Sequence, residues 1–169
     1  MKKETTFSEI KKAGYTDKSI NQEIQDNLIA RIKSEKGVFP DLIGYENSVI
    51  PQLKKAIIAG HHINLLGLRG QAKTKIARSM IDLLDEYIPV VKGSEINDSP
   101  FRPISKYSQD LLNKYGDNTP ISWVHRSERY YEKLATPDVN VSDLIGDIDP
   151  IKAATLKLEY SDEGVLHYG

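Results

Sequence analysis

The sequence contains no cysteine. This absence excludes disulfides, thiolate zinc sites and cysteine nucleophiles, and it fits a reducing compartment. The chain also lacks any run of about 18 apolar residues, so we expect no segment to span a membrane. The opening residues, MKKETTFSEIKKAG, have no apolar stretch of the kind found in a signal peptide. The expected compartment is therefore the cytoplasm.

Positively and negatively charged residues are nearly equal in number. The 169 residues include 23 Lys and Arg against 24 Asp and Glu, for a formal net charge of −1. This balance gives no reason to expect a nucleic-acid or anionic-membrane surface, although it allows a local basic patch. With 39% apolar and 28% charged residues, the composition is typical of a globular protein that buries a core unaided.

Helical periodicity is clear near the N-terminus. After a polar lead-in with one short turn around 7–12, we expect a helix over 19–36. Its apolar stripe consists of Ile20, Ile24, Leu28 and Ile32. Ser19 and Gln22 fit a capping box at its start, and Gly37 fits its end.

A second helix is expected from residue 46 or 47 to residue 59. Pro51 falls in its first turn, where a missing N–H is tolerated, and Gly60 follows its end. Its inner face consists of Val49, Leu53, Ile57 and Ile58.

A strand, a loop, a helix and a second strand are expected next. HHINLLGL (61–68) is a short apolar run, GLRGQAKT (67–74) is glycine-rich, and KIARSMIDLLDEY (75–87) has helical spacing. Its inward residues are Ile76, Ala77, Met80, Ile81 and Leu84. A strand over 88–91 would complete the order that is typical of an α/β fold with a parallel sheet.

The following segment, about 92–135, is interpreted as a surface insertion. It is expected to hold one short helix near 105–115 and short strands or a hairpin at 120–124 and 129–134. Beyond a turn at Gly146, further short elements are expected at 149–157, 156–160 and 165–168.

The loop at 67–74 follows the P-loop pattern G-x-x-x-x-G-K-[ST], with Gly67, Lys73 and Thr74 in place and Gly70 inside it. Glycines let backbone N–H groups approach phosphate oxygens, and the following helix directs its N-terminus at the same anion. The Lys73 ammonium would reach the β- and γ-phosphates, and the Thr74 hydroxyl would hold Mg²⁺. This predicts binding of a nucleoside triphosphate, ATP first of all.

Ala72 stands where the pattern has its last glycine. If the position requires a positive φ, alanine would cost on the order of 1–2 kcal/mol there, and nucleotide affinity would fall about tenfold. The alternative to a P-loop is a glycine-rich turn that happens to carry Lys-Thr.

Other polar residues give weaker signals. IDLLDE (81–86) imitates the acidic strand of an ATPase, but it begins eight residues after Lys73 with helical spacing, so Asp85 and Glu86 are interpreted as solvated charges on the helix's last turn. The histidines are expected to be structural or exposed: His61, His62, His125 and His167. Arg126 and Arg129, in HRSERYYEK, suggest either a partner or nucleic-acid contact or, preferably, an amphipathic surface strand.

Several segments together resemble the AAA+ ATPases, and within them the magnesium-chelatase ATPase subunit and its MoxR-type relatives. FPDLIGYE (39–46) is similar to the motif that packs near the adenine, with Ile43 and Gly44 at its core and Tyr45 where glutamine is common. NLLGLRGQAKTKIAR is similar to the first strand and P-loop. KLATPDVNVSDLIGDIDPIKA carries Gly146 and Asp149 at the positions of a chelatase pattern, and DEGVLHYG is similar to the stretch before the acidic strand.

The resemblance implies a three-layer αβα P-loop NTPase fold, incomplete at the C-terminus, over 39–169, preceded by a helical lead-in over 1–38. It implies ATP and Mg²⁺ as ligands, with Lys73 and Thr74 catalytic and Thr74 on the metal. The implied nucleotide-binding residues are Gly67, Gly70, Gln71, Ala72, Lys73, Thr74, Lys75, Ile43 and Gly44.

The resemblance also implies partners. The family forms rings, usually hexameric, and ATP hydrolysis remodels a partner, often a protein with a von Willebrand A domain or a metal-chelatase complex. The acidic strand, the sensor residues and the arginine finger of the family would follow Gly169. The chain is therefore expected to be part of a longer ATPase and to show little hydrolysis by itself.

Three other functions stay open. One is a non-hydrolysing nucleotide-binding or regulatory module, and another is an interaction domain without nucleotide. A P-loop kinase of small metabolites is less favoured, because such kinases carry the loop near the N-terminus.

Overall fold

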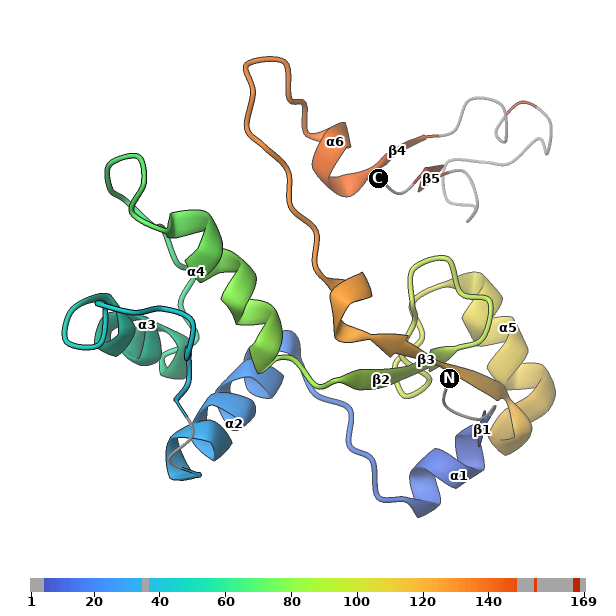
Figure 1. The fold of residues 1–169 in the computed structure, drawn as a ribbon. Helices are drawn as coiled ribbons and strands as arrows, with labels where there is room; N and C mark the ends of the chain where they lie inside the picture. The colour runs from blue at the N-terminus through green and yellow to red at the C-terminus, as the bar shows by residue number, and fades with distance from the viewer. Residues whose placement is uncertain (1–4, 35–36, 149–153, 155–165, 168–169) are drawn as a thin grey trace. The chain divides into compact units, whose positions relative to one another are not determined.

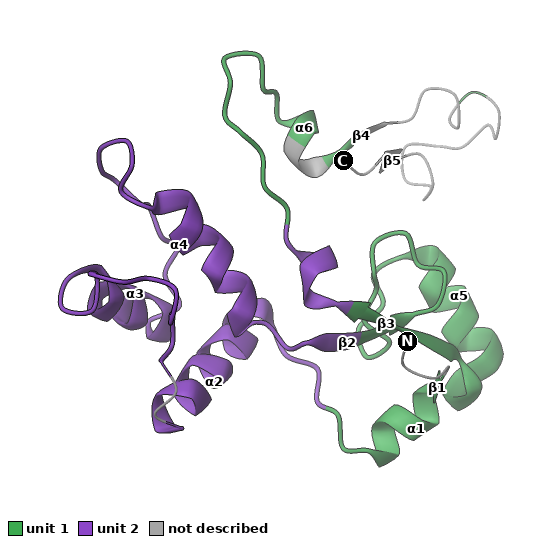
Figure 2. Ribbon diagram, viewed as in Figure 1, with its two compact units in different colours: residues 1–15, 89–124, 131–169 green, residues 16–88, 125–130 purple. Residues whose placement is uncertain are grey.

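The computed structural model describes residues 5–34, 37–148, 154 and 166–167 (Figure 1). The chain divides into two compact units (Figure 2). Unit 1 comprises residues 1–15, 89–124 and 131–169, and unit 2 comprises residues 16–88 and 125–130. Every helix in the described residues is too short or too polar to cross a membrane.

The sheet of three strands is antiparallel and runs in the order β1-β3-β2. Its strands are β1 (Thr5–Thr6), β2 (Tyr87–Val91) and β3 (Pro120–His125). Thr5 pairs with Ile121, and the Lys92 N–H donates to the Pro120 carbonyl at 3.1 Å beside β2. The strands expected at 88–91 and 120–124 are therefore confirmed. The parallel sheet was expected from 88–91 and a strand at 61–68, and among the described residues 61–68 are in no strand.

The core of unit 1 combines residues of these strands with residues of two helices, α1 (Phe7–Lys12) and α5 (Lys106–Tyr115). A capping box starts α1, with the Thr6 N–H donating to the Glu9 carboxylate at 2.9 Å. The buried cluster is Phe7, Ile10 and Ile121, with Tyr15, Phe101, Leu112 and Trp123 packed against it. The rings of Phe7 and Phe101 meet edge to face with centroids 5.1 Å apart. The expected turn at 7–12 is confirmed.

Asp98 fixes the loop that leads into α5. Its carboxylate accepts the N–H groups of Ile104 and Ser105, both at 2.9 Å, and Ser105 caps the helix by accepting the Ser108 N–H at 3.1 Å. Burial by itself would raise the pKa of Asp98, but these hydrogen bonds and that of the Ser105 hydroxyl outweigh it and hold the pKa below its ordinary value. The helix predicted near 105–115 is thus confirmed. The 3₁₀ helix η2 (Gly116–Asn118) follows it.

The remaining described part of unit 1 is small. Residues 131–141 form no helix or strand. The short helix α6 (Ser142–Ile145) then precedes a two-stranded antiparallel pair, β4 (Asp147–Ile148) with β5 (Leu166–His167). Asp149 and the elements expected at 149–157 and 156–160 lie outside the described residues.

Unit 2 is helical. It contains α2 (Ile20–Lys33), α3 (Val49–Ile58), α4 (Lys73–Ser79) and the 3₁₀ helices η1 (Met80–Leu83) and η3 (Arg126–Arg129). Their shared buried core is Leu28, Val38, Phe39, Leu42, Ile50, Leu53, Ile57, Ile76 and Leu83. The two helices predicted before residue 60 are confirmed, with Ser19 accepting the Gln22 N–H at 3.3 Å as the cap of α2. Three of the predicted apolar positions in these helices are nevertheless exposed: Ile20 at 61%, Ile32 at 42% and Ile58 at 50%.

The helix expected over 75–87 changes type before it ends. After α4 the chain tightens into η1, which turns every 3.0 residues instead of every 3.6. Leu83, seven residues after the buried Ile76, is completely buried in η1, whereas Leu84, which was expected to face inward, is only partly buried. The chain then becomes extended at Leu84.

Two predicted strands are not formed. Residues 61–68 have no strand pairing in the described chain, and most of their side chains are exposed, with Leu66 at 87% and Leu68 at 77%. A strand exists only where a neighbour takes its N–H and C=O groups, and no described segment pairs with this one. Residues 129–134 likewise form no strand, because the chain turns through η3. The helices α2 and α4 lie on either side of the proposed division at residue 38 and share one buried core.

Candidate nucleotide-binding loop

The predicted P-loop forms an exposed turn before α4 in unit 2. Gly70 has a φ of +82°, with open space where a Cβ would stand, so its backbone conformation, not crowding, favours glycine. Ala72, directly before the helix, has φ +52° and ψ +20° and is left-handed. The position where the pattern has its last glycine therefore does adopt the conformation that favours glycine.

Lys73 folds back over this turn. Its ammonium donates to the carbonyl oxygens of Gly67 at 2.9 Å and Leu68 at 2.5 Å. The cation is thereby held against the start of the loop, although Lys73 itself is the first residue of α4. A phosphate group that entered the loop would find a positive charge already beside it.

Gln71 closes the loop from the other side. Its side-chain oxygen accepts the Leu68 N–H at 2.9 Å. A Cβ added at Gly67 would lie 2.2 Å from the same oxygen, so the side chain passes closely over that glycine. Gly67, Gly70, Gln71, Ala72 and Lys73 are thus brought together as one turn, as the pattern predicts.

The two residues that follow differ in their surroundings. Thr74 is exposed, as a metal-binding hydroxyl would have to be. The Lys75 ammonium instead donates to the Asp41 carbonyl at 2.6 Å, which ties α4 to the segment that resembles the adenine motif. Lys75 is therefore engaged with backbone and does not extend toward the turn of the loop.

Within the segment 39–46, the two predicted site residues are both at the surface. Ile43 is 84% exposed, whereas its neighbour Leu42 is buried in the core. Gly44 has a φ of +87°, and its N–H donates to the Glu46 carboxylate at 3.0 Å. Hydrogen bonds from the Glu46 N–H and from Gly44 lower the pKa of that carboxyl. Leu42 anchors the segment, and Ile43 is left available for a ligand or a partner.

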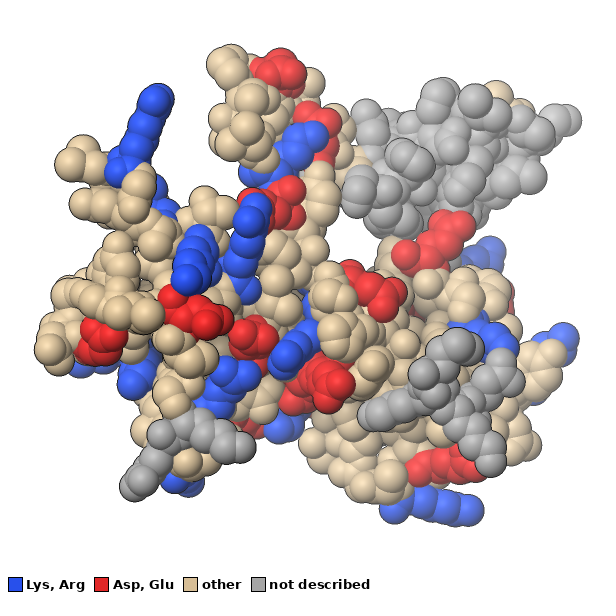
Figure 3. All heavy atoms as spheres, viewed as in Figure 1, with Lys and Arg blue, Asp and Glu red and all other residues tan. Residues whose placement is uncertain are grey.

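Charges of both signs surround this region. On the face drawn in Figure 3, Lys and Arg side chains occur along the loop and α4, with Asp and Glu side chains beside them. Among the described residues, no group of three or more His, Asp or Glu side chains is placed to hold a metal ion. Thr74 remains the predicted Mg²⁺ ligand of the loop.

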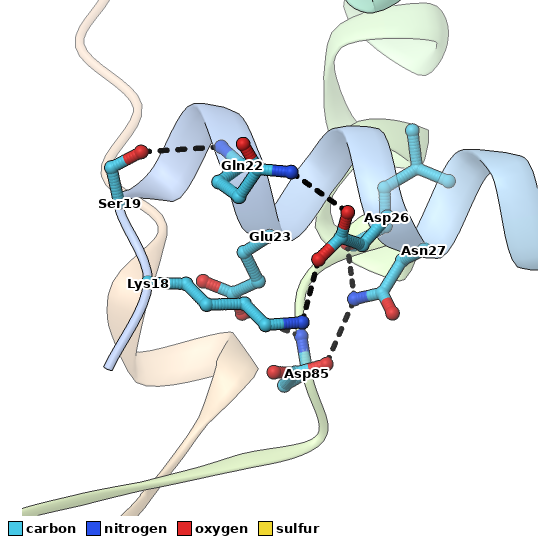
Figure 4. Close-up of polar contacts among 8 residues, drawn as sticks. Lys18, Ser19, Gln22, Glu23, Asp26, Asn27 and Asp85 are labelled. Atoms are coloured by element: carbon cyan, nitrogen blue, oxygen red, sulfur yellow. Dashed lines mark hydrogen bonds and ion pairs between the residues drawn. The ribbon is translucent and has the colours of Figure 1, made fainter. Parts of the chain in front are cut away.

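A buried polar cluster in unit 2 was missed by the sequence reasoning. Arg129 makes two hydrogen bonds of 2.6 Å to the Glu23 carboxylate, and the two side chains are only 11% and 5% exposed. The Glu23 carboxylate also accepts the Asp85 N–H at 2.6 Å, and the Asp85 carboxylate accepts from Asn27 at 2.9 Å (Figure 4). No local signal indicates a pair 106 residues apart in sequence.

This cluster corrects two expectations. Asp85 is not a solvated charge on a last helical turn, because the chain is extended there and packs against α2. Arg129 lies in η3 and pairs with Glu23, and Arg126 pairs with Asp82 at 3.1 Å, so neither belongs to an amphipathic surface strand. The rejection of IDLLDE as an acidic strand is confirmed, because its first half lies in η1 and none of its residues is in a strand.

A groove of about 680 Å³ lies beside this cluster. Its polar lining includes Asn27, Arg31, Asp82, Asp85 and Arg126. These groups already bond to one another or to backbone. Arg31, for example, donates to the Asp82 carbonyl at 2.6 Å. The five polar groups named are therefore engaged in contacts within unit 2.

Comparison with known proteins adds no identification: no family model matches the chain, and neither the curated proteins nor the solved structures provide a match.

Replacing Ala72 by Gly is expected to raise the free energy of unfolding by up to about 1 kcal/mol. The left-handed conformation costs alanine about 1–2 kcal/mol, and the larger chain entropy of glycine offsets about 0.5–1 kcal/mol of this gain. The tenfold loss of nucleotide affinity expected from Ala72 does not follow, because the strain exists before any ligand arrives, so Ala72→Gly should change the affinity little. Urea denaturation followed by circular dichroism measures the stability change.

Ala30, exposed within α2, provides the matched control. Glycine there should lower stability by about 0.5–1 kcal/mol, since it loosens a regular helix. A loss of the same sign and size in Ala72→Gly would contradict the left-handed assignment at Ala72.

Proposed function

We propose that this chain binds the phosphates of ATP in the loop formed by residues 67–74. The observation that carries the proposal is the position of the Lys73 ammonium, which lies against the Gly67 and Leu68 carbonyls. A glycine-rich turn with an unrelated role gives no reason for its lysine to fold back over the turn. A phosphate-binding loop requires that placement, because the cation must face the β- and γ-phosphates.

The residues of the loop would have different roles in binding the nucleotide. Backbone N–H groups between Gly67 and Lys73 would donate to phosphate oxygens, and the Lys73 ammonium would neutralise their charge. The Thr74 hydroxyl would hold Mg²⁺, which supplies further charge neutralisation when it is bound. Residues 39–46, tied to α4 through Lys75, would lie toward the base of the nucleotide.

The wider proposal rests on the resemblance to the magnesium-chelatase and MoxR-type AAA+ ATPases. It assigns the chain to an ATPase of αβα fold that forms a ring and remodels a partner protein or a chelatase complex, and the cytoplasm is the compartment expected from the sequence. A von Willebrand A-domain protein fits the partner's role. The same resemblance leads us to expect that this chain binds nucleotide with little turnover.

An interaction module without nucleotide is the second candidate. It is favoured by Leu66 and Leu68, which expose 87% and 77% of their surface directly before and within the loop. Exposed apolar side chains in such a group mark surfaces that another protein covers.

Titration with a fluorescent ATP analogue and Mg²⁺ separates the two candidates. Saturable binding that weakens at least tenfold in Lys73→Ala is the expected result, because one charge-assisted contact to phosphate contributes about this much. Lys55→Ala, at an exposed site in α3, is the control and should bind normally. Absence of binding by the folded wild-type chain would reject the nucleotide function and leave the interaction module.

A further inference from the structure

Gln71 engages an amide of the loop that the proposed function requires for phosphate. Its side-chain oxygen accepts the Leu68 N–H at 2.9 Å, so this oxygen stands as a neutral acceptor inside a loop whose donors would otherwise receive an anion. From this geometry we propose that Gln71 is a built-in competitor of the phosphate, so that the loop closes on itself until nucleotide displaces the glutamine. The proposal rests on the nucleotide function and adds its regulation.

The side chain of Gln71 also lies close to Gly67. The Gln71 oxygen lies only 2.2 Å from the place where a Cβ of residue 67 would stand, so the glutamine uses space that the glycine at residue 67 leaves open. One side chain thus uses both the N–H of Leu68 and the open space above Gly67. An incoming phosphate oxygen would use the same N–H group and the same open space.

Gln71 and Lys73 both make hydrogen bonds that close the empty loop, but they have opposite effects on the affinity for phosphate. Lys73 donates to the Gly67 and Leu68 carbonyls, and its positive charge attracts a phosphate once these bonds open. Gln71 is an acceptor here, like the phosphate itself, and must leave before the Leu68 N–H can bind an anion. Removing the lysine should therefore weaken binding, whereas removing the glutamine side chain should strengthen it.

The exposure of Gln71 and Leu68 sets the expected change in nucleotide affinity. Both Gln71 and Leu68 are exposed, so their hydrogen bond competes with water and its net contribution is modest. Relief from it corresponds to a dissociation constant lower by about two- to tenfold. The backbone N–H of residue 71 is retained in any variant, so its own contribution to phosphate binding is preserved.

Three variants test the proposal by titration with the fluorescent ATP analogue and Mg²⁺. Gln71→Ala removes the acceptor, and Gln71→Asn keeps the amide on a side chain one methylene shorter; both should bind about two- to tenfold more tightly than wild type. Gln71→Glu keeps the acceptor and adds a negative charge, so it should bind more weakly. Equal or weaker binding by Gln71→Ala, with Lys73→Ala still impaired, would overturn the inference and leave the nucleotide function standing.

Hydrogen exchange of the Leu68 amide in the free protein gives a readout that needs no nucleotide. Exchange should be faster in Gln71→Ala than in wild type, because the protecting acceptor is gone. Equal exchange rates would show that the contact does not form and would also overturn the inference. If no variant binds nucleotide, the proposed function fails and the inference fails with it.

Discussion

Arg129→Ala is expected to lower the free energy of unfolding of unit 2 by about 3–5 kcal/mol, the usual cost of removing one partner of a buried ion pair. The substitution leaves the Glu23 carboxylate, 5% exposed, without either of its two guanidinium hydrogen bonds. Only the Asp85 N–H would still donate to it. A carboxylate kept away from water with one donor is strongly disfavoured, so the local packing of α2 should open to hydrate it.

The measurement is hydrogen exchange of α2 amides combined with urea denaturation followed by circular dichroism. Fluorescence of Trp123 is less suitable, because the single tryptophan belongs to unit 1. Lys18→Ala is the matched control in the same unit: Lys18 pairs with Asp26 at 2.6 Å, but each side chain is 37% exposed, so water compensates for much of the lost contact. Comparable losses in the two variants would show that the Glu23–Arg129 pair is not buried.

A double variant distinguishes the energy of the pair from the penalty of an orphaned charge. Glu23→Leu with Arg129→Met replaces both charges by apolar groups of similar length. It should be less destabilised than Arg129→Ala, because no unpaired charge is left in the interior.

Local chemistry explains which elements could be predicted from the sequence. The helix α5 begins where Ser105 accepts the Ser108 N–H, and this cap depends on a residue type at a fixed spacing. The loop before α4 was located in the same way, from glycines followed by Lys-Thr. Such features depend on neighbours along the chain, and the sequence shows those neighbours directly.

Features that depend on distant partners could not be predicted. Residues 61–68 have the composition of a buried strand, but a short apolar run does not say whether another segment will pair with it. Glu23 reads as an ordinary acidic residue in the first turn of α2, and only the fold brings Arg129 to it. The change from α4 to the 3₁₀ helix η1 likewise has no signature in the spacing of its residues.

The same distinction between local and fold-dependent features applies to the candidate site. The pattern identified the residues of the turn, but it did not show that Lys73 would bind the loop's own carbonyls or that Gln71 would occupy the Leu68 N–H. Both contacts depend on side-chain reach and on the left-handed backbone at Ala72. They turn a motif that predicts binding into a loop whose empty state competes with its ligand.

Leu28→Ala is the second substitution with a large expected effect, a loss of about 2–5 kcal/mol in the free energy of unfolding of unit 2. Leu28 is completely buried in α2 and belongs to the same core as Ile76 of α4. Removing three carbon atoms there leaves a cavity that the surrounding helices fill only partly. Urea denaturation gives the overall loss, and Ile29→Ala, at a neighbour that is 39% exposed, should cost about 1 kcal/mol or less.

The same variant tests whether α2 is a lead-in or part of the domain that carries the loop. If α2 and α4 share one cooperative core, Leu28→Ala should speed hydrogen exchange in α4 as well as in α2, and ATP binding should weaken as the temperature rises. If 1–38 is a separate lead-in, exchange in α4 should stay at the wild-type rate. The burial of Leu28 beside Ile76 favours the first result, since a cavity in a shared core destabilises every helix that lines it.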